Sequence, residues 1–285
     1  MKEIFSYIVL GIIGLFLLWY VFSLLTGQKY KKRLFGTRRI TGYSSDVPVG
    51  GNVFGAYYCL REGQRFGVFK RQLDQRLIAS FFMKWILEGK ATVHSTGGVL
   101  RSASVELHLD MGFDDRTEMA LFEMALAASG RDYVLTTGEF SRWVRNNYRI
   151  IDNWTDRARN RGRRYLICRG LMDETNHGTE AGFARLRGVI EFKEFLKSPS
   201  RGLDRKVPQP QKWMGYLVLS GLYGYAGRMA DVLRRTYPSD FSQFSAQQAQ
   251  LSGSLDMALS VSNSLSQAYG RAVKREEEYR ERRNR

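Results

Sequence analysis

The sequence predicts an α+β protein that is mostly helical, with one N-terminal transmembrane helix followed by a cytosolic region and a helical C-terminus. Three observations predict this class. The chain begins with an uncharged apolar run, and several later segments repeat apolar residues at the three-to-four spacing of amphipathic helices. Short alternating segments beside glycine turns indicate strands between these helices. We therefore expect the cytosolic region to contain tandem winged-helix-like units.

Composition limits the class of protein and its partners. The 285 residues are 44% hydrophobic and 13% aromatic, which are globular values and exclude wholesale disorder. The net charge of +16 favours anionic neighbours, either phospholipid headgroups or nucleic acid. Cys59 and Cys168 lie far apart in the sequence, so they form neither a metal-ligand spacing nor a disulfide framework.

The first domain, residues 1–26, is expected to be a transmembrane anchor. Ile4–Leu25 contains no charged residue, and roughly 22 helical residues span about 33 Å, enough to cross a hydrocarbon core of about 30 Å. A cleaved signal peptide would need a shorter apolar run and a small-x-small cleavage site, and "SLLTGQK" offers none. A buried core helix is the other alternative. The length of the run favours an uncleaved anchor.

Residues 27–45 are expected to form a basic juxtamembrane linker. Only Lys2 and Glu3 are charged before the span, whereas the basic residues after it are Lys29, Lys31, Lys32, Arg33, Arg38 and Arg39. The positive-inside rule then predicts a single-pass protein of the cell membrane, with a short N-terminus outside and the C-terminal region in the cytoplasm. The same cluster would bind anionic headgroups, at about 1 kcal/mol per charge. A nucleic-acid arm is the weaker alternative.

Residues 46–112 are expected to form the first winged-helix-like unit. The Gly-, Ser- and Pro-rich stretch 41–55 reads as a linker that enters the fold. Apolar residues at three-to-four spacing predict a helix from about 68 to 88, ended by Gly89. The alternation around Thr96-Gly97-Gly98 predicts a β-hairpin with a glycine turn.

Residues 113–197 are expected to form the second winged-helix-like unit with a closing helix. Asp115 followed by Glu118 indicates a helix start, and this helix should end near Gly130. Thr136 and Glu139 form a capping box that should open the helix in "GEFSRWVRNNYRIIDNWTDRARNR". "RRYLICRGLM" is interpreted as a short strand plus turn, and an amphipathic helix is predicted from Thr179.

Residues 198–240 combine a proline-containing loop with an apolar, glycine-rich helix. The uncharged run 213–226 would extend only about 21 Å as a helix, so it is too short for a second membrane crossing. A core helix is the favoured interpretation, and an interfacial or re-entrant segment is the alternative.

Residues 241–285 are expected to form a Ser/Gln-rich and charged tail, helical or flexible. A weakly amphipathic stripe could serve a coiled-coil partner or self-association through this helix. The stripe consists of Leu251, Leu255, Ala258, Ser262, Leu265 and Tyr269. The last residues, "RAVKREEEYRERRNR", mix both signs and are typical of a solvated helix.

The sequence carries no recognisable enzyme signature. Neither a glycine-rich phosphate loop nor a nucleophile motif occurs, and His94, His108 and His177 are too scattered for a metal site. Asp114 and Asp115 are better explained as a helix start than as an acid–base pair. We therefore expect no catalytic residues, no cofactor and no metal; an enzyme with an unrecognised site remains a third alternative.

One basic run is chemically suggestive. Arginines interleaved with Trp143, Tyr148 and Trp154 could neutralise phosphates in a winged helix. The candidates for anion or nucleic-acid contact are Arg142, Arg145, Arg149, Arg157, Arg159, Arg163 and Arg164. An amphipathic helix that buries its aromatic residues and exposes arginine to solvent or to anionic lipid is the favoured alternative.

Four stretches give the chain a resemblance to a known family. They are "DVPVGG", "FMKWILEGKATV", "TEAGFARLRGVIEFKEFL" and "KWMGYLVLSGLYGYAGRM". In this order, over roughly residues 46–240, the chain resembles the cytoplasmic C-terminal half of a family of predicted bacterial membrane proteins, domain of unknown function 2207. The resemblance implies a membrane-anchored cytosolic module with winged-helix-like parts and no established activity. The family's extracytoplasmic domain and Gly/Ser-rich tail are absent from this chain, and the family offers no catalytic residues to carry over.

The sequence therefore predicts a single-pass membrane-anchored cytosolic protein-interaction or scaffold module of unknown biochemical activity. Its expected partners are the lipid bilayer with its anionic headgroups and another membrane or envelope protein, which could supply an outward-facing domain. The competing class is a membrane-tethered, winged-helix regulator that binds nucleic acid through the arginine-rich region.

Overall fold

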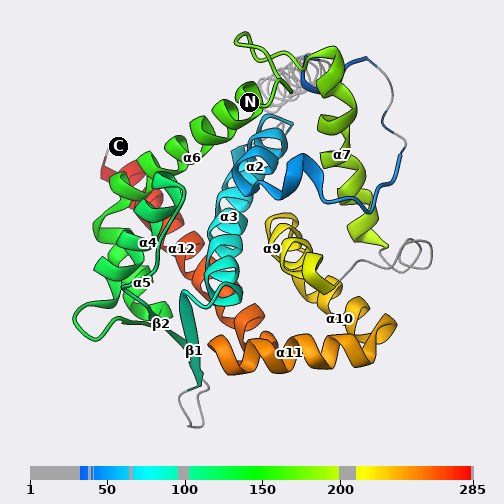
Figure 1. Cartoon of the computed structure of the whole chain (residues 1–285). Helices are drawn as coiled ribbons and strands as arrows, with labels where there is room; N and C mark the ends of the chain where they lie inside the picture. Colours follow the sequence, from blue (N-terminus) through cyan, green and yellow to red (C-terminus); the bar gives the residue numbers. More distant parts are fainter. Residues whose placement is uncertain are drawn as a thin grey trace, which may run out of the picture.

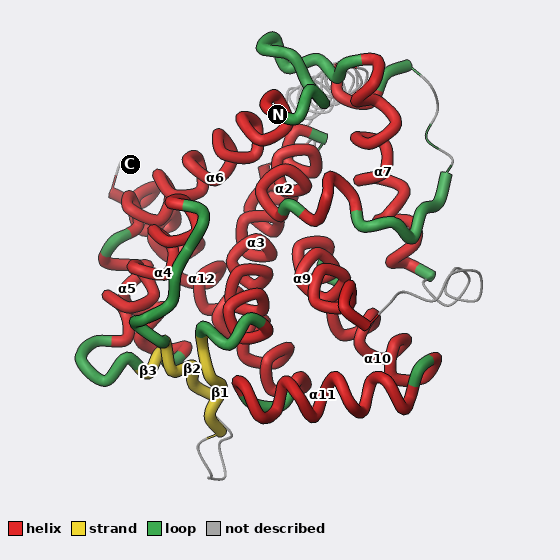
Figure 2. The backbone as a smooth tube through the Cα atoms, in the orientation of Figure 1, coloured by secondary structure: helices red, strands yellow, loops and turns green. Residues whose placement is uncertain are grey.

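The computed structural model describes residues 33–37, 40, 42–63, 67–95, 103–198 and 210–283. This part of the chain is mostly helical (75%) and carries a small three-stranded antiparallel sheet (Figures 1 and 2), which confirms the predicted mostly helical α+β composition. The expected anchor, residues 1–26, lies outside the described residues, as do Lys29, Lys31, Lys32, Arg38 and Arg39 of the basic cluster.

The helix α3 (Gly67–Leu87) runs through the centre of the molecule. It packs against α2 (Val53–Glu62), α9 (Trp213–Tyr223) and α12 (Leu255–Arg283), so it is covered from several sides (Figure 1). Its fully buried side chains include Leu77, Ile78, Phe82 and Trp85. The helix predicted from 68 to 88 is thus confirmed, and Gly89 follows it in the left-handed region with φ of 70°.

The predicted hairpin is also confirmed. Strand β1 (Ala91–Ser95) pairs antiparallel with β2 (Ala103–Leu107), which pairs in turn with β3 (Val134–Leu135). The register places Val93 opposite Val105, and Val105 opposite Leu135, so one face of the sheet enters the core. The glycine turn expected at 96–98 lies outside the described residues.

Two predicted capping signals start helices where they were expected. The Asp115 carboxylate accepts hydrogen bonds from the backbone N–H groups of Thr117 (2.8 Å) and Glu118 (3.2 Å) and begins α4 (Arg116–Ser129). Thr136 and Glu139 form a reciprocal capping box at the start of α5 (Thr137–Asn146). Each side chain satisfies backbone donors that the first helical turn leaves unpaired.

The strand predicted in "RRYLICRGLM" is wrong. Most of this stretch belongs to α6 (Tyr148–Cys168), because Leu166 continues the buried stripe of Ile151, Trp154 and Ala158 at helical spacing. Between 148 and 197 the described strand pairing is one isolated bridge, Met172 to Gly178. A second winged-helix unit with its own strand pair is therefore not formed. The single helix expected after Thr136 is instead divided at Asn147 into α5 and α6.

The helices that follow agree with the sequence. Thr179 caps α7 (Glu180–Lys197) by accepting from the Gly182 N–H at 2.9 Å. The apolar run is the core helix α9, which buries Leu217, Leu219 and Leu222 completely and ends at the left-handed Gly224. Helices α10 (Ala226–Thr236) and α11 (Pro238–Ser252) continue the chain to α12. No helix in the described ranges is both long and apolar enough to cross a membrane.

The expected C-terminal tail is largely core. Helix α12 packs on α3 and α5, and it buries Leu255, Ala258, Ser262, Leu265 and Tyr269 of the predicted stripe. Leu251, at the end of α11, is 59% exposed. The face that was expected to meet a partner helix is therefore used within the chain.

Candidate functional site

Three arginines connect α6 to other elements. Two of them, Arg159 and Arg163, are among the seven candidates, and the third is Arg161. Arg159 forms an ion pair with Glu62 of α2 at 2.6 Å, and Arg161 pairs with the capping residue Asp115 of α4. Because these guanidinium groups already have carboxylate partners, they hold helices together and are poorly placed to take up a further anion.

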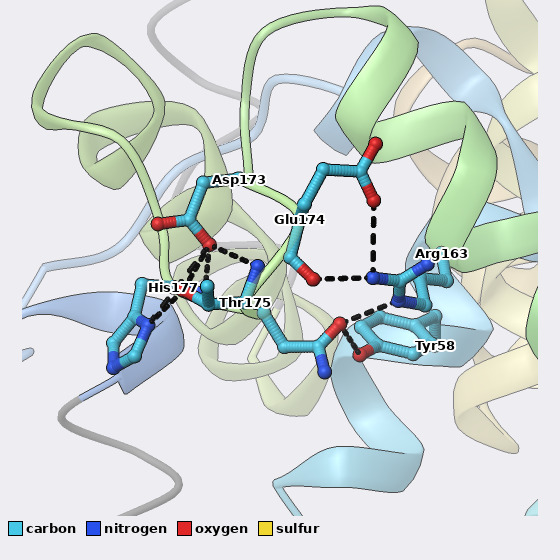
Figure 3. A network of polar contacts seen from close by, with 7 residues as sticks. Tyr58, Arg163, Asp173, Glu174, Thr175 and His177 are labelled. Carbon is cyan, nitrogen blue, oxygen red and sulfur yellow. Dashed lines mark hydrogen bonds and ion pairs between the residues drawn. The ribbon is translucent and has the colours of Figure 1, made fainter.

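Arg163 braces the loop between α6 and α7 (Figure 3). Its guanidinium donates to the Glu174 carbonyl oxygen at 2.5 Å and to Asn176 Oδ1 at 2.6 Å. Inside the loop, the Asp173 carboxylate accepts from the backbone N–H groups of Thr175 (2.9 Å) and His177 (2.8 Å). These bonds lower the pKa of Asp173 below its usual value. The 173–177 loop is thus held by its own hydrogen bonds, and Arg163 fixes it to α6.

The other five candidate arginines are exposed and have no ion-pair partner among the described residues. They are Arg142, Arg145, Arg149, Arg157 and Arg164. On α6, the exposed Asp152 lies three residues after Arg149, and the exposed Asp156 directly precedes Arg157. These carboxylates place negative charge among the arginines. The arginines therefore do not build one dense positive surface.

Arg33 is the one described member of the predicted membrane-surface cluster, and the residues after it are not a free linker. Leu34 and Phe35 are only 2% and 1% exposed, and the Arg33 carbonyl accepts from the Gly178 N–H at 2.8 Å. Gly178 leaves no room for a side chain, since a Cβ there would lie 2.5 Å from the Leu34 carbonyl oxygen. The chain is therefore fixed to the helical body at residues 33–35.

The cavity of about 660 Å³ between residues 44–50, the end of α6 and α7 is named here the α6–α7 cavity. Tyr165 and Arg169 line it from α6 and its C-cap, and Arg185, Gly188 and Glu191 line it from α7. No local sequence pattern predicts this cavity, because the 44–50 segment lies more than a hundred residues before the other walls in α6 and α7. The one available signal was "DVPVGG", whose residues 46–50 form one wall of the cavity.

The backbone of this wall is strained. Val49, Gly50 and Gly51 have φ values of 44°, 63° and 78°, so three successive residues are left-handed. A β-branched residue such as Val49 rarely adopts this conformation. The Tyr165 hydroxyl donates to the Val49 carbonyl at 2.9 Å and helps to hold the turn. Strain of this kind persists where the surrounding structure enforces it, and it concentrates at binding sites.

The α6–α7 cavity contains charges of both signs. Asp46 and Glu191 provide carboxylates, and Arg169 and Arg185 provide guanidinium groups. None of the four has an ion-pair partner among the described side chains, although the Arg169 guanidinium lies 5.7 Å from the centroid of the Tyr165 ring. The cavity thus presents unpaired charges to solvent, which makes it the strongest candidate for a binding site.

A second polar cluster is buried between α2 and α3. The Tyr57 hydroxyl donates to the Asp74 carboxylate at 2.5 Å, and Arg61 donates to the same carboxylate at 2.5 Å and to the Tyr57 hydroxyl oxygen. Asp74 is only 7% exposed, and burial raises the pKa of its carboxyl to about 6 while Arg61 and Tyr57 oppose that rise. Burial also raises the pKa of Tyr57 well above its ordinary value.

Asp74 is expected to make the stability of the chain depend on pH. Its pKa is raised in the folded state, so the folded chain binds the proton more tightly and its contribution to stability is lost as the pH rises from about 4 to 6. The unfolding free energy of the wild type minus that of Asp74→Asn should fall by about 2 kcal/mol over this window. Urea unfolding of the detergent-purified chain at pH 4, 5, 6 and 7 measures it. The exposed Asp114→Asn is the control, and a pH-independent difference for Asp74→Asn would contradict the expectation.

Within the described ranges, no group of three or more His, Cys, Asp or Glu side chains is placed to hold a metal ion. His94 forms a cross-strand pair with Glu106 at 2.7 Å, and His108 with Thr92 at 3.0 Å, as expected for residues that alternate in a hairpin. Cys59 is buried and Cys168 is exposed, and both are free thiols.

Comparisons of the chain with family models, with curated proteins and with solved structures found no match. The fold and the site thus define the class of protein by themselves: a mostly helical body with a small antiparallel sheet and a cavity that carries charges of both signs.

Proposed function

We propose that the chain is a single-pass membrane-anchored module whose helical body lies on the cytosolic face and binds a partner protein as a scaffold. The observation that carries this proposal is the docking of Leu34 and Phe35 into the body directly after the apolar segment. From Leu25 to Arg33 there are roughly eight residues, which reach at most about 27 Å when extended. A body held this closely to an anchor would lie against the membrane surface.

The docking also supports an orientation. Because Arg33 bonds to Gly178, the end of the body that carries the 173–177 loop would face the bilayer. The β1–β2 hairpin and α11 lie at the opposite end in Figure 1, so they would face away from the membrane. On this proposal, that distant end is accessible to a cytosolic partner.

The proposed relation to domain of unknown function 2207 draws support from one winged-helix-like arrangement. The elements follow one another in the order α3, β1, β2, α4, β3 and α5, and α3 packs on β1 while α4 packs on β3 and α5. Ring centroids of Phe82 and Phe140 lie 5.5 Å apart across α3 and α5, and those of Trp85 and Phe122 lie 5.0 Å apart across α3 and α4. This supports one winged-helix-like unit in place of the two that the sequence predicted.

The same arrangement bears on the nucleic-acid alternative. In helix-turn-helix proteins a recognition helix enters the major groove. The helix before the hairpin, which would take this role, is α3, and it is covered by α2, α9 and α12. Nucleic-acid binding would therefore need another surface, such as Arg142 and Arg145 on α5. The protein-interaction module is the better supported function, and the proposal assigns no catalysis to it.

Membrane fractionation of the full chain tests this proposal. The chain should remain in the membrane pellet after alkaline carbonate extraction, and deletion of residues 2–25 should release it. An impermeant maleimide should label the exposed Cys168 only after cells are permeabilised, with Cys168→Ser as the control. Labelling in intact cells would contradict the orientation, and a soluble full chain would contradict the anchor. Binding of DNA or RNA at physiological salt that Arg142→Gln and Arg145→Gln abolish would favour the regulator instead.

A further inference from the structure

We propose that the α6–α7 cavity binds a zwitterionic ligand that carries a phosphate and an ammonium group, such as the phosphoethanolamine headgroup of a phospholipid. That the ligand is a lipid headgroup rests on the proposed membrane anchoring, whereas the binding of a zwitterion to the cavity does not. The cavity measures about 660 Å³ and opens beside the strained turn at Val49–Gly51.

The charges of the cavity select this class of ligand. Arg169 and Arg185 come from different elements, so their guanidinium groups can donate to separate oxygens of one phosphate. A free phosphate would also meet the carboxylates of Asp46 and Glu191, which repel it. A simple cation would meet the two arginines. A ligand with one group of each sign can satisfy both pairs.

The walls are shaped to admit such a group. Gly188 lies in the middle of α7, and a Cβ placed there would meet no atom within 4 Å, so this wall leaves open space. The buried Pro48 and Val49 add an apolar surface beside the charges. Because Tyr165 lies under Arg169 and also bonds to Val49, it orients both the arginine and the strained turn.

The cavity lies where a phospholipid headgroup could reach it if the chain is anchored in the membrane. Ala184 lines the cavity, and its neighbour Phe183 packs where Gly36 and Gly178 meet α7. The cavity is therefore close to the place where the chain joins the body at residue 33. If the preceding segment spans the membrane, this is the end of the body that headgroups can reach.

Calorimetric titration of the detergent-purified full chain with phosphoethanolamine tests the inference. We expect binding at least tenfold tighter than that of inorganic phosphate or of ethanolamine. Arg169→Gln and Arg185→Gln should each weaken it roughly tenfold, since each removes a charge-assisted contact. Gly188→Leu should abolish binding by filling the cavity without lowering the thermal midpoint, since leucine is the better helix former. The matched controls are Arg157→Gln, which removes an exposed and unpaired charge elsewhere, and Gly227→Leu, at a helical glycine that also has open space around it.

Nanodiscs distinguish the two sources of the ligand. If the lipid headgroup occupies the cavity, phosphoethanolamine should bind more weakly to the chain in phosphatidylethanolamine nanodiscs than in phosphatidylglycerol nanodiscs. Equal binding in both would show that the ligand is a soluble zwitterion. The inference is overturned if phosphoethanolamine binds no better than inorganic phosphate, or if Gly188→Leu binds like the wild type. A soluble chain that binds the zwitterion would contradict only the anchor, and a membrane-bound chain that does not bind it would contradict only this inference.

Discussion

Deletion of residues 255–285 is expected to abolish the cooperative unfolding transition of the chain. Helix α12 covers α3 and α5, and its deletion would remove buried side chains such as Leu265 and Tyr269 together with the rest of that interface. Burial of one large apolar side chain contributes about 1.5–3 kcal/mol, and a domain is stable by only about 5–15 kcal/mol in total. Losing several such residues at once exceeds that margin. Thermal unfolding followed by circular dichroism and limited proteolysis of the detergent-purified chain measures the effect.

A shorter deletion provides the control. Val273 is the last residue of α12 that is buried, and the ion pair between Glu277 and Arg71 beyond it is partly exposed. Deletion of residues 275–285 should therefore change the unfolding free energy by only about 1 kcal/mol. If the two deletions had equal effects, or if the longer one left a sharp transition, α12 would be an appended tail as the sequence suggested.

The correct predictions depended on local signals. Asp115, Thr136 and Thr179 each cap a helix by bonding to backbone groups within three residues, so a few neighbouring letters are enough to locate the start. The hairpin likewise follows from alternation beside a glycine turn. Such signals need no knowledge of the rest of the fold.

The incorrect predictions concerned segments whose state depends on distant partners. The serine content of α12 suggested a weak, solvated helix, yet Ser262 and Ser266 are buried and bring its backbone close to the helices it covers. Leu34 and Phe35 looked like part of a basic linker because this segment contacts the loop before α7, about 140 residues later in the sequence, and the end of α2. Periodicity within one segment carries no information about such pairings.

The candidate site also combines residues that a local pattern reveals with residues that only the fold brings together. The arginine run was visible in the sequence, but only the structure separates Arg159 and Arg163, which are held by other elements, from the exposed arginines. The α6–α7 cavity has no local signature, since only the fold brings Asp46, Arg169 and Arg185 to the walls of one cavity. What the sequence did offer was "DVPVGG", a stretch whose two glycines follow a strained valine.

A Gly162→Ala substitution is expected to destabilise the chain by about 3 kcal/mol or more, although alanine is the better helix former. Gly162 lies within the arginine-rich half of α6, where "RNRGRR" gives no reason for a glycine in a helix interior. The reason is that α2 crosses α6 at this point. A Cβ on Gly162 would lie 2.1 Å from the Phe54 carbonyl oxygen and 2.9 Å from the Tyr58 Cβ, so the two helices would have to separate.

Gly188→Ala in α7 is the matched control for this prediction. It is also a mid-helix glycine, but no atom lies within 4 Å of its Cβ position, so the substitution should stabilise the chain by about 0.5–1 kcal/mol through helix propensity alone. Urea unfolding of both variants separates close packing from propensity. If Gly162→Ala were also stabilising, α2 and α6 would not be in contact at Phe54. Because Arg159 lies three residues before Gly162 and reaches Glu62 of α2 across that contact, its assignment as a structural residue would then fail as well.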